Sequence, residues 1–265
     1  MPVSIAPKDF KKHIANGGSV ISGWCSIPST VTAEIVARHG FDAVTVDLQH
    51  GLIDYQTSLA MLQVIGVSGA SAFCRVPWND PAPIMKALDA GFTGIICPMV
   101  NTREEAERFV GACRYTPHGY RSYGPTRAAR LHDDYAVAAA ELVVTLPMIE
   151  TGEAVRNLDE ILAVPGVDGV YIGPADLAMS LGYAPSMFST DKPVLDAIAT
   201  ICNRAKAAGK IAGIHAGSAA QASEMIGKGF NFVALSTDIR LFTNAVAAAV
   251  AETRGKVAEI SAGQY

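Results

Sequence analysis

Charged residues are scarce in this sequence, and neither sign dominates. They make up 17% of the 265 residues, and 21 Lys and Arg against 25 Asp and Glu give a net charge of −4. With 50% hydrophobic residues, the chain can bury a sizeable core and does not resemble a disordered tail. Nucleic-acid binding needs a basic cluster to neutralise phosphates, and no basic run stands out. We therefore expect a globular protein without a nucleic-acid partner.

Long hydrophobic runs are also absent. The two uncharged windows, 14–33 and 55–74, are interrupted by Gly, Ser, Asn, Gln or Pro, which are unfavourable in hydrocarbon. Charged residues already occur at positions 8–12, with no leucine-rich stretch ahead of a cleavage site. We expect neither a membrane span nor a signal peptide, no membrane partner, and a cytoplasmic location.

Cysteine is infrequent, and its spacing carries no metal or disulfide pattern. The five cysteines are scattered, odd in number and contain no Cys-x-x-Cys pair. A disulfide framework and a zinc knuckle are therefore not expected. Most of the cysteines lie in apolar segments, which predicts small buried hydrophobic side chains.

Short apolar segments alternate with helical patterns along the whole chain. The segments lack strict alternation, as is typical of parallel strands buried on both faces. Eight strands and eight helices over about 250 residues predict an α/β fold, a single (β/α)8 TIM barrel spanning residues 1–265. An open doubly wound sheet is the alternative, although no Gly-x-Gly-x-x-Gly follows the first strand. The expected strands are Val20–Cys25, Ala43–Leu48, Ser71–Val76, Gly94–Met99, Leu142–Ile149, Gly169–Ile172, Ile211–Ile214 and Phe232–Leu235.

The helical patterns begin at recognisable capping residues. Asp54 is a natural N-cap, and Thr102 precedes acidic residues that favour the positive end of a helix. Two connections are unusually long, Tyr115–Asp134 and Ala175–Asp191, and the second directly follows a strand, where barrels build active sites. The expected helices are Thr30–Arg38, Asp54–Ile65, Pro81–Asp89, Thr102–Ala112, Thr151–Leu162, Lys192–Ala208, Ser218–Lys228 and Asp238–Ile260.

Polar side chains gather where the expected strands end. In a barrel these carboxyl ends meet at one mouth, where charged groups avoid burial in the core. The carboxylates of Glu150 and Asp176, the His50 imidazole and the Arg75 guanidinium would meet there, which favours a hard divalent cation beside an acidic substrate. None of the nine lysines ends a strand, which excludes a Schiff-base aldolase. The strand-end residues are Trp24, Asp47, His50, Arg75, Glu150, Asp176 and His215.

Four of these residues also have a structural interpretation. Glu150 opens a helix as well as closing a strand, and Asp176 could cap the first turn of the following loop. His50 could be a satisfied core histidine, and Arg75 could pair with an aspartate such as Asp47. The functional interpretation is favoured because the residues end several neighbouring strands at once.

Five segments carry a likeness to a known family: VDLQHG (46–51), CRVPWND (74–80), GYRSYGPTRAAR (119–130), MIETGEAVRNLDEIL (148–162) and GVDGVYIGPADLAMSLGY (166–183). They resemble the metal-dependent pyruvate aldolases of the HpcH/HpaI family, from Trp24 to residues 233–242. The resemblance implies a TIM barrel, often a homohexamer (a trimer of dimers) whose last helix is exchanged between neighbours. It implies a divalent cation, Mg²⁺, Mn²⁺ or Co²⁺, and small-molecule partners, a 2-oxo acid such as pyruvate or hydroxypyruvate and an aldehyde.

The resemblance also implies roles for individual residues. Glu150 of the IET segment and Asp176 of the GPADL segment match the metal-binding acids. The backbone N–H groups of Ala175 and Asp176 match the groups that hold the donor carboxylate.

Three further positions match the family's proton-transfer machinery. His50 matches the base, Asp89 matches the residue that raises its basicity, and Arg75 matches the group that stabilises the enolate. This assignment agrees with the chemistry, because cleavage of the C3–C4 bond of a 4-hydroxy-2-oxo acid leaves an enolate that a metal and Arg75 would stabilise. Asp89 has the alternative of pairing with Arg75.

The sequence departs from the family pattern at three positions. Gln49 stands where many members have glutamate, Met148 where many have glutamine, and His215 where an aliphatic residue is usual. Met148 and His215 therefore belong to the expected substrate pocket, in which His215 could contact a polar acceptor or line the mouth. Trp24 fits the aromatic wall of that pocket. The departures bear on the substrate more than on the reaction.

We predict a divalent-metal-dependent carbon–carbon lyase that reversibly cleaves 4-hydroxy-2-oxo acids to pyruvate or hydroxypyruvate and an aldehyde. A CoA-thioester lyase of the citryl or malyl type, or an oxaloacetate decarboxylase, is the alternative on the same barrel. A non-catalytic barrel is disfavoured because the positions of His50, Glu150 and Asp176 are all filled.

Overall fold

The computed structural model describes residues 5–255, in which parallel strands alternate with helices. Each strand is short and almost wholly buried, because the helices cover its outer face and the barrel interior covers the other. The strands are β1 Val20–Cys25, β2 Ala43–Asp47, β3 Ser71–Arg75, β4 Gly94–Cys97, β5 Val144–Pro147, β6 Gly169–Ile172, β7 Ile211–Ala216 and β8 Phe232–Leu235.

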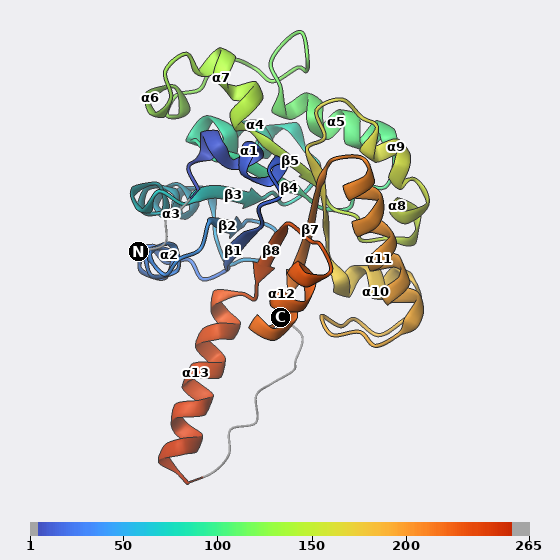
Figure 1. Cartoon of the computed structure of the whole chain (residues 1–265). Coiled ribbons are helices and arrows are strands. Elements are labelled where there is room, and N and C mark those ends of the chain that lie inside the picture. The colour runs from blue at the N-terminus through green and yellow to red at the C-terminus, as the bar shows by residue number, and fades with distance from the viewer. Residues whose placement is uncertain (1–4, 256–265) are drawn as a thin grey trace.

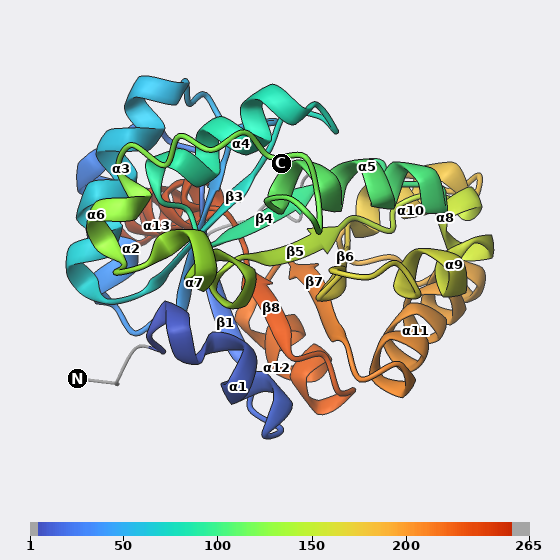
Figure 2. The same ribbon diagram turned by 90° about the horizontal axis from the view of Figure 1, so that it is seen from above.

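The strands form one sheet that closes on itself. Their order is β5-β4-β3-β2-β1-β8-β7-β6, and all hydrogen-bonded neighbours are parallel. Between the two ends of that order, Met148 bridges to Tyr171, and the Ile149 N–H donates to the Tyr171 carbonyl at 2.8 Å. Seen from above, the strands converge on a common axis inside a ring of helices (Figure 2). The predicted single (β/α)8 barrel is confirmed.

The helices begin where the sequence provides capping groups. The side chains of Asp54, Asp80, Thr102 and Ser218 each accept a hydrogen bond from a first-turn N–H group. The helices are α1 Phe10–Ala15, α2 Thr30–Arg38, α3 Tyr55–Ser68, α4 Pro81–Ala90, α5 Arg103–Cys113, α6 Ala128–Leu131, α7 Tyr135–Leu142, α8 Gly152–Arg156, α9 Leu158–Leu162, α10 Pro174–Ser180, α11 Lys192–Ala207, α12 Ala219–Gly227 and α13 Asp238–Thr253, preceded by the 3-10 turn Pro7–Asp9.

The core has two main layers. Aliphatic side chains fill the space between strands and helices, whereas the barrel interior is rich in aromatic residues. Phe10 of α1 lies against Phe73 and Phe232, with ring centroids 5.1 and 6.1 Å away, and closes the amino end of the barrel. At the carboxyl end, Trp24 and Tyr171 stack at 5.7 Å and form the floor of a cavity.

The structure corrects several expected boundaries. Leu142 ends α7 and does not begin the fifth strand, and the segment 151–162 forms two short helices. The 175–191 connection begins with α10, and α1 was not expected at all. The last helix ends at Thr253, and the part of its expected range beyond 255 lies outside the described residues.

Helix α13 differs from the other helices because it projects away from the barrel (Figure 1). Of its residues, only Asp238 is buried. Within residues 5–255, none of the helices combines the length and hydropathy needed to cross a bilayer.

Candidate active site

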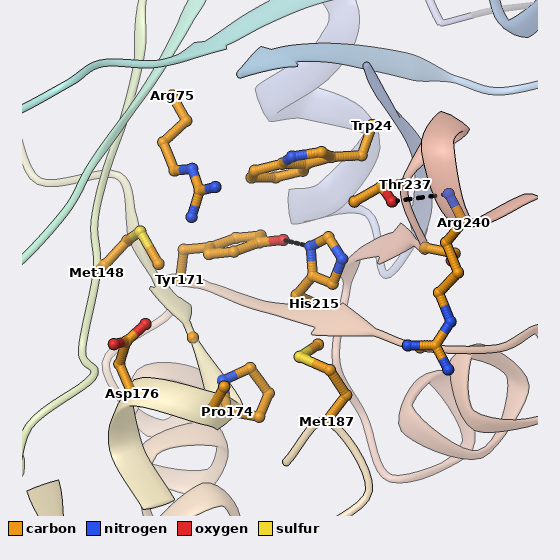
Figure 3. A pocket seen from close by; sticks show the side chains of 14 residues that line it. Trp24, Arg75, Met148, Tyr171, Pro174, Asp176, Met187, His215, Thr237 and Arg240 are labelled. Atoms are coloured by element: carbon orange, nitrogen blue, oxygen red, sulfur yellow. Dashed lines mark hydrogen bonds between the residues drawn. The ribbon is translucent and has the colours of Figure 1, made fainter. Parts of the chain in front are cut away.

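A cavity opens at the carboxyl ends of the strands (Figure 3). Its empty space, which includes open solvent at the mouth, is roughly 560 Å³. Residues that also line it, but that the sequence did not single out, are Tyr171, Met187 and Arg240. The predicted site residues in its wall are Trp24, Arg75, Met148, Ala175, Asp176 and His215.

Strand register brings Asp47 and Arg75 together. They are direct partners in the β2–β3 ladder, and the Asp47 carboxylate accepts from Arg75 Nε at 2.9 Å and from Nη2 at 2.6 Å. The Trp24 indole N–H donates to the same carboxylate at 3.3 Å, and the Arg75 guanidinium lies 4.9 Å from the Trp24 ring centre. Burial alone would raise the pKa of Asp47, but the Arg75 charge and hydrogen bonds hold it below its ordinary value. Arg75 is therefore fixed as a buried cation in the cavity wall.

Glu150 is buried behind the cavity and is held by one backbone group. Its Oε1 accepts from the Met99 N–H at 2.7 Å. Burial raises the pKa of Glu150 to about 7, with a further increase from the Asp176 charge, while the Met99 N–H and Arg75 oppose the shift. A bound cation would stabilise the ionised form of a carboxylate that is buried away from water.

The Met99 backbone depends on Asn101. Met99 has a φ of 54°, a left-handed conformation that is rare outside glycine. The Asn101 side chain donates to the Met99 carbonyl at 3.1 Å, and its carbonyl oxygen accepts from the Thr151 hydroxyl. Asn157 and Glu105 hold the Asn101 backbone at 2.9 and 2.6 Å. Neither Met99 nor Asn101 carries a sequence signal, because the strain is visible only in three dimensions.

Helix α10 presents its first turn to the cavity. Its N-cap is Gly173, which has no side chain to accept from the first N–H groups, and Ala175 and Asp176 lie in that turn. Such a turn favours an anion. A Cβ atom on Gly173 would clash with Oε2 of Glu150, so the glycine allows α10 and Glu150 to approach closely.

His215 lies in the middle of the cavity and not at its edge. Its Nδ1 lies 3.2 Å from the Tyr171 hydroxyl, and its ring meets Trp24 edge-on at 4.8 Å. Burial lowers the pKa of His215 to about 3, and the charges of Arg75 and Arg240 lower it further while Asp47 opposes. The imidazole is therefore neutral at physiological pH.

His50 and Asp89 do not come together within the chain. His50 follows β2, is exposed, and its backbone N–H lies 3.3 Å from Oδ1 of Asp47. Asp89 lies in the last turn of α4, which runs back toward the amino ends of the strands, and it pairs with Arg121 at 2.7 Å. Within the chain Arg75 pairs with Asp47 and Asp89 pairs with Arg121, and the role of Asp89 toward His50 stays a prediction.

The acids suit a hard divalent cation that keeps open positions. No group of three or more His, Cys, Asp or Glu residues that could hold a metal occurs within residues 5–255. Mg²⁺ or Mn²⁺ binds through one or two carboxylates and completes its shell with water and substrate oxygens. Glu150 and Asp176 are close enough for the Asp176 charge to raise the pKa of Glu150. The donor set fits such an ion and lacks the nitrogen and sulfur ligands typical of a structural zinc site.

Comparison with known proteins agrees with this site. The family model of the HpcH/HpaI aldolase/citrate lyase family matches residues 23–245. A hydroxypyruvate/pyruvate aldolase from Rhizorhabdus wittichii is 46% identical over 90% of this chain and 95% of its own. A pyruvate aldolase from Rhizobium etli is 40% identical over 88% of this chain and 92% of its own. The crystal structure of an HpcH/HpaI family protein from Burkholderia cenocepacia has a TM-score of 0.88 and 29% identity, covering 93% of this chain and 99% of that one.

The chain belongs to the HpcH/HpaI aldolase/citrate lyase family, and its relatives, which are named aldolases, identify it as a carbon–carbon lyase. The predicted family and enzyme class are confirmed. The aldolase prediction is also confirmed at this level, since these relatives are aldolases, and the thioester-lyase alternative has less support.

Proposed function

We propose that this protein is a divalent-metal-dependent aldolase that uses pyruvate or hydroxypyruvate as the donor and a short aldehyde as the acceptor. The observation that carries the proposal is that the buried Glu150 feels the charge of Asp176, which lines the same cavity wall as the buried cation Arg75. A cation held by Glu150 and Asp176 would supply Lewis-acid stabilisation of the donor oxygens.

The donor is held by α10 and Arg75. Ala175 and Asp176 lie in the first turn of α10, and their N–H groups would bind the donor carboxylate. Arg75 places its charge where the C2 oxygen becomes negative as the enolate forms, and Asp47 prevents the guanidinium from turning away. Met148, buried in the wall, excludes water from the donor.

His50 transfers the proton in this proposal. In cleavage it takes the proton of the C4 hydroxyl, the C3–C4 bond breaks, its electron pair stays on the keto fragment as an enolate, and the aldehyde leaves. The position of the His50 backbone supports this role. The Asp47 carboxylate, which also orients Arg75, accepts hydrogen bonds from the N–H groups of Gln49 and His50 at 3.0 and 3.3 Å. One side chain thereby fixes both the cation and the loop that carries the base.

The test is adduct formation by protein stripped with EDTA. Pyruvate or hydroxypyruvate is mixed with glycolaldehyde, with and without Mg²⁺, Mn²⁺ or Co²⁺. We expect turnover only with metal, and a loss of at least a hundredfold in His50→Ala and Glu150→Gln. Activity that persists in Glu150→Gln at saturating metal would contradict the proposal, and absence of turnover with all donors would favour the thioester lyase.

We also propose that the protein is a homo-oligomer, with the hexamer as the expected form. Helix α13 projects from the barrel and exposes Leu241, Phe242, Val246 and Val250, with 44–66% of each side chain accessible. Phe242→Glu with Val246→Glu should lower the mass measured by light scattering. Val67→Glu is the control, because it places a charge on α3 at a residue that is 80% exposed, and it should leave the measured mass unchanged. A wild-type monomer would contradict this proposal.

The cytoplasm is the compartment that we propose for this enzyme. All five cysteines are unpaired thiols and lie buried in the structure, which suits a reducing environment. Cell fractionation tests this directly, and recovery of the protein outside the cytoplasm would contradict it.

A further inference from the structure

A second cavity lies on the outer side of the barrel wall, next to the substrate cavity. On β7, Ile214 lines the second cavity and the next residue, His215, lines the substrate cavity, because successive residues of a strand point to opposite faces. The empty space of the second cavity, which includes open solvent, is roughly 940 Å³. Its apolar lining includes Leu195 and Ile198 of α11 and Met225 of α12. The barrel wall therefore has a cavity on each of its faces at this point.

Met187 lies at the boundary between the two cavities. It belongs to the connection between α10 and α11, and together with Pro174 it lines both the substrate cavity and the second cavity. Figure 3 shows its thioether directed into the substrate cavity, between Pro174 and His215. The boundary therefore depends on one long, unbranched side chain beside a proline ring.

The side chain of Gln221, on α12, holds Met187 at this boundary. Its Nε2 donates to the Met187 carbonyl at 2.6 Å, and its Oε1 accepts from the Gly217 N–H at 2.7 Å. A Cβ atom on Gly217 would lie 2.6 Å from the ring of Phe188 and 3.3 Å from Cβ of Met187. The glycine thus allows the connection to pack directly against the end of β7, and the Gln221 amide joins the two segments.

The lining of the second cavity suits an aliphatic chain. Within the described residues, its charged member is Lys228, which pairs with Glu224 at 2.6 Å. The Gln221 amide is occupied by its two backbone partners, and the Cys202 thiol lies 3.9 Å from the Lys228 carbonyl. An aliphatic chain that enters this space leaves water for mostly apolar surroundings, which is favourable.

We propose that Met187 limits the length of the acceptor aldehyde, and that Gln221 is the positioning residue that keeps Met187 at the boundary. This inference rests on the proposed aldolase function and adds the class of its second substrate, aldehydes whose chain ends before Met187. The donor occupies the end of the cavity near Arg75 and Asp176, which leaves the space beside Met187 for the acceptor. A shorter side chain at position 187 joins the two cavities, so that the chain of a longer aldehyde extends into the second one.

The experiment compares hexanal with propanal as acceptors, in the presence of the metal and the donor. The readout is the ratio of kcat/KM for hexanal to kcat/KM for propanal. The variants are Met187→Ala, the double variant Met187→Ala with Ile198→Phe, which fills the second cavity, and Gln221→Glu, which replaces the N–H donor to Met187 by an oxygen. Met179→Ala on α10, at a residue that is 57% exposed, and Gln63→Glu on the exposed face of α3 are the matched controls.

We expect the ratio to rise about tenfold or more in Met187→Ala, because burial of each further methylene group favours binding roughly fourfold. The added Ile198→Phe should return the ratio to about the wild-type value. Gln221→Glu should raise the ratio about threefold, because Met187 loses the bond that fixes it. Both control variants should keep the wild-type ratio.

Three results would overturn the inference while leaving the aldolase intact. They are a ratio unchanged within about twofold in Met187→Ala, a rise that persists when Ile198→Phe is added, and a wild type that already prefers hexanal. An unchanged ratio in Gln221→Glu would refute the positioning role of Gln221. Turnover of no aldehyde by wild type would instead refute the proposed function.

Discussion

The backbone N–H of Met99 donates a 2.7 Å hydrogen bond to Oε1 of Glu150, from a residue whose φ is 54°. Strain of this kind persists only where the surroundings enforce it. Here the bond occupies one carboxylate oxygen and leaves Oε2 next to Gly173, at the start of the helix that carries Asp176. In the proposed function, this arrangement would orient Glu150 before a cation binds.

Asn101→Ala should weaken cation binding without removing a ligand. The substitution deletes the bond to the Met99 carbonyl at 3.1 Å and the partner of the Thr151 hydroxyl. Loss of groups that orient metal ligands typically reduces affinity 10–100-fold, so we expect Mn²⁺ affinity to fall about tenfold in calorimetry. Asn203→Ala, on the exposed face of α11, is the control. Equal affinity in wild type and Asn101→Ala would mean that Met99 holds Glu150 unaided.

Gly173→Ala should remove activity while preserving the fold. The added methyl group would clash with Oε2 of Glu150 and lie 3.0 Å from Met148 Cε, so either Glu150 or α10 must move. We expect at least a tenfold loss of metal affinity, together with circular dichroism like that of wild type. Gly66→Ala on α3 is the matched control, because a Cβ there meets nothing within 4 Å. Full activity of Gly173→Ala would show that close approach of α10 is not required.

The bond between Asp47 and Arg75 should make stability depend on pH. The pKa of Asp47 is lowered in the fold, so its contribution is complete above its ordinary value of 3.8 and is lost as the pH falls through the lower folded value. Arg75→Met leaves a buried carboxylate unpaired and should cost about 3–5 kcal/mol at pH 7, measured by urea unfolding. The difference in the free energy of unfolding between Arg75→Met and wild type should become smaller as the pH falls toward and below 4.

The control for that measurement is Arg38→Met. It breaks an exposed pair with Glu34 in which 61% and 45% of the two side chains are accessible, so its effect should stay below about 1 kcal/mol. Similar losses for Arg75→Met and Arg38→Met would argue against a buried, structurally important pair.

His215 should remain neutral across the physiological range. Its folded pKa of about 3 lies below the ordinary 6.5, so the unfolded chain takes up a proton first and this group reduces stability as the pH falls below 6.5. Nitrogen-15 NMR of the imidazole should show no titration between pH 5 and 8, with the signal assigned from a His215→Gln variant. A midpoint near 6.5 would mean that water reaches the ring freely.

Much of the barrel and part of the site follow from local sequence patterns. Short apolar segments with glycine-ended helices between them set the strands β1, β6 and β8 at the expected residues. Because parallel strands end at one face, the positions of Arg75, Asp176 and His215 in one cavity could also be predicted.

The rest depends on the path of the backbone. Asp89 at the end of α4 pairs with Arg121, and no local pattern reports which distant side chain a helix end will meet. The strained Met99 and the contact of Arg240 with Phe188 arise from packing between segments far apart in sequence. Boundaries such as the end of α7 at Leu142 were missed because an apolar helix turn and a strand look alike.

Proton exchange at C3 of the donor tests enolate formation directly, because it needs no acceptor. Pyruvate is incubated in D₂O with metal-loaded protein, and loss of the methyl signal is followed by proton NMR. The account predicts rapid exchange that requires the metal and that falls at least a hundredfold in Glu150→Gln and Arg75→Met. Exchange that proceeds equally well after metal removal or in Glu150→Gln, or no exchange with either pyruvate or hydroxypyruvate, would contradict it.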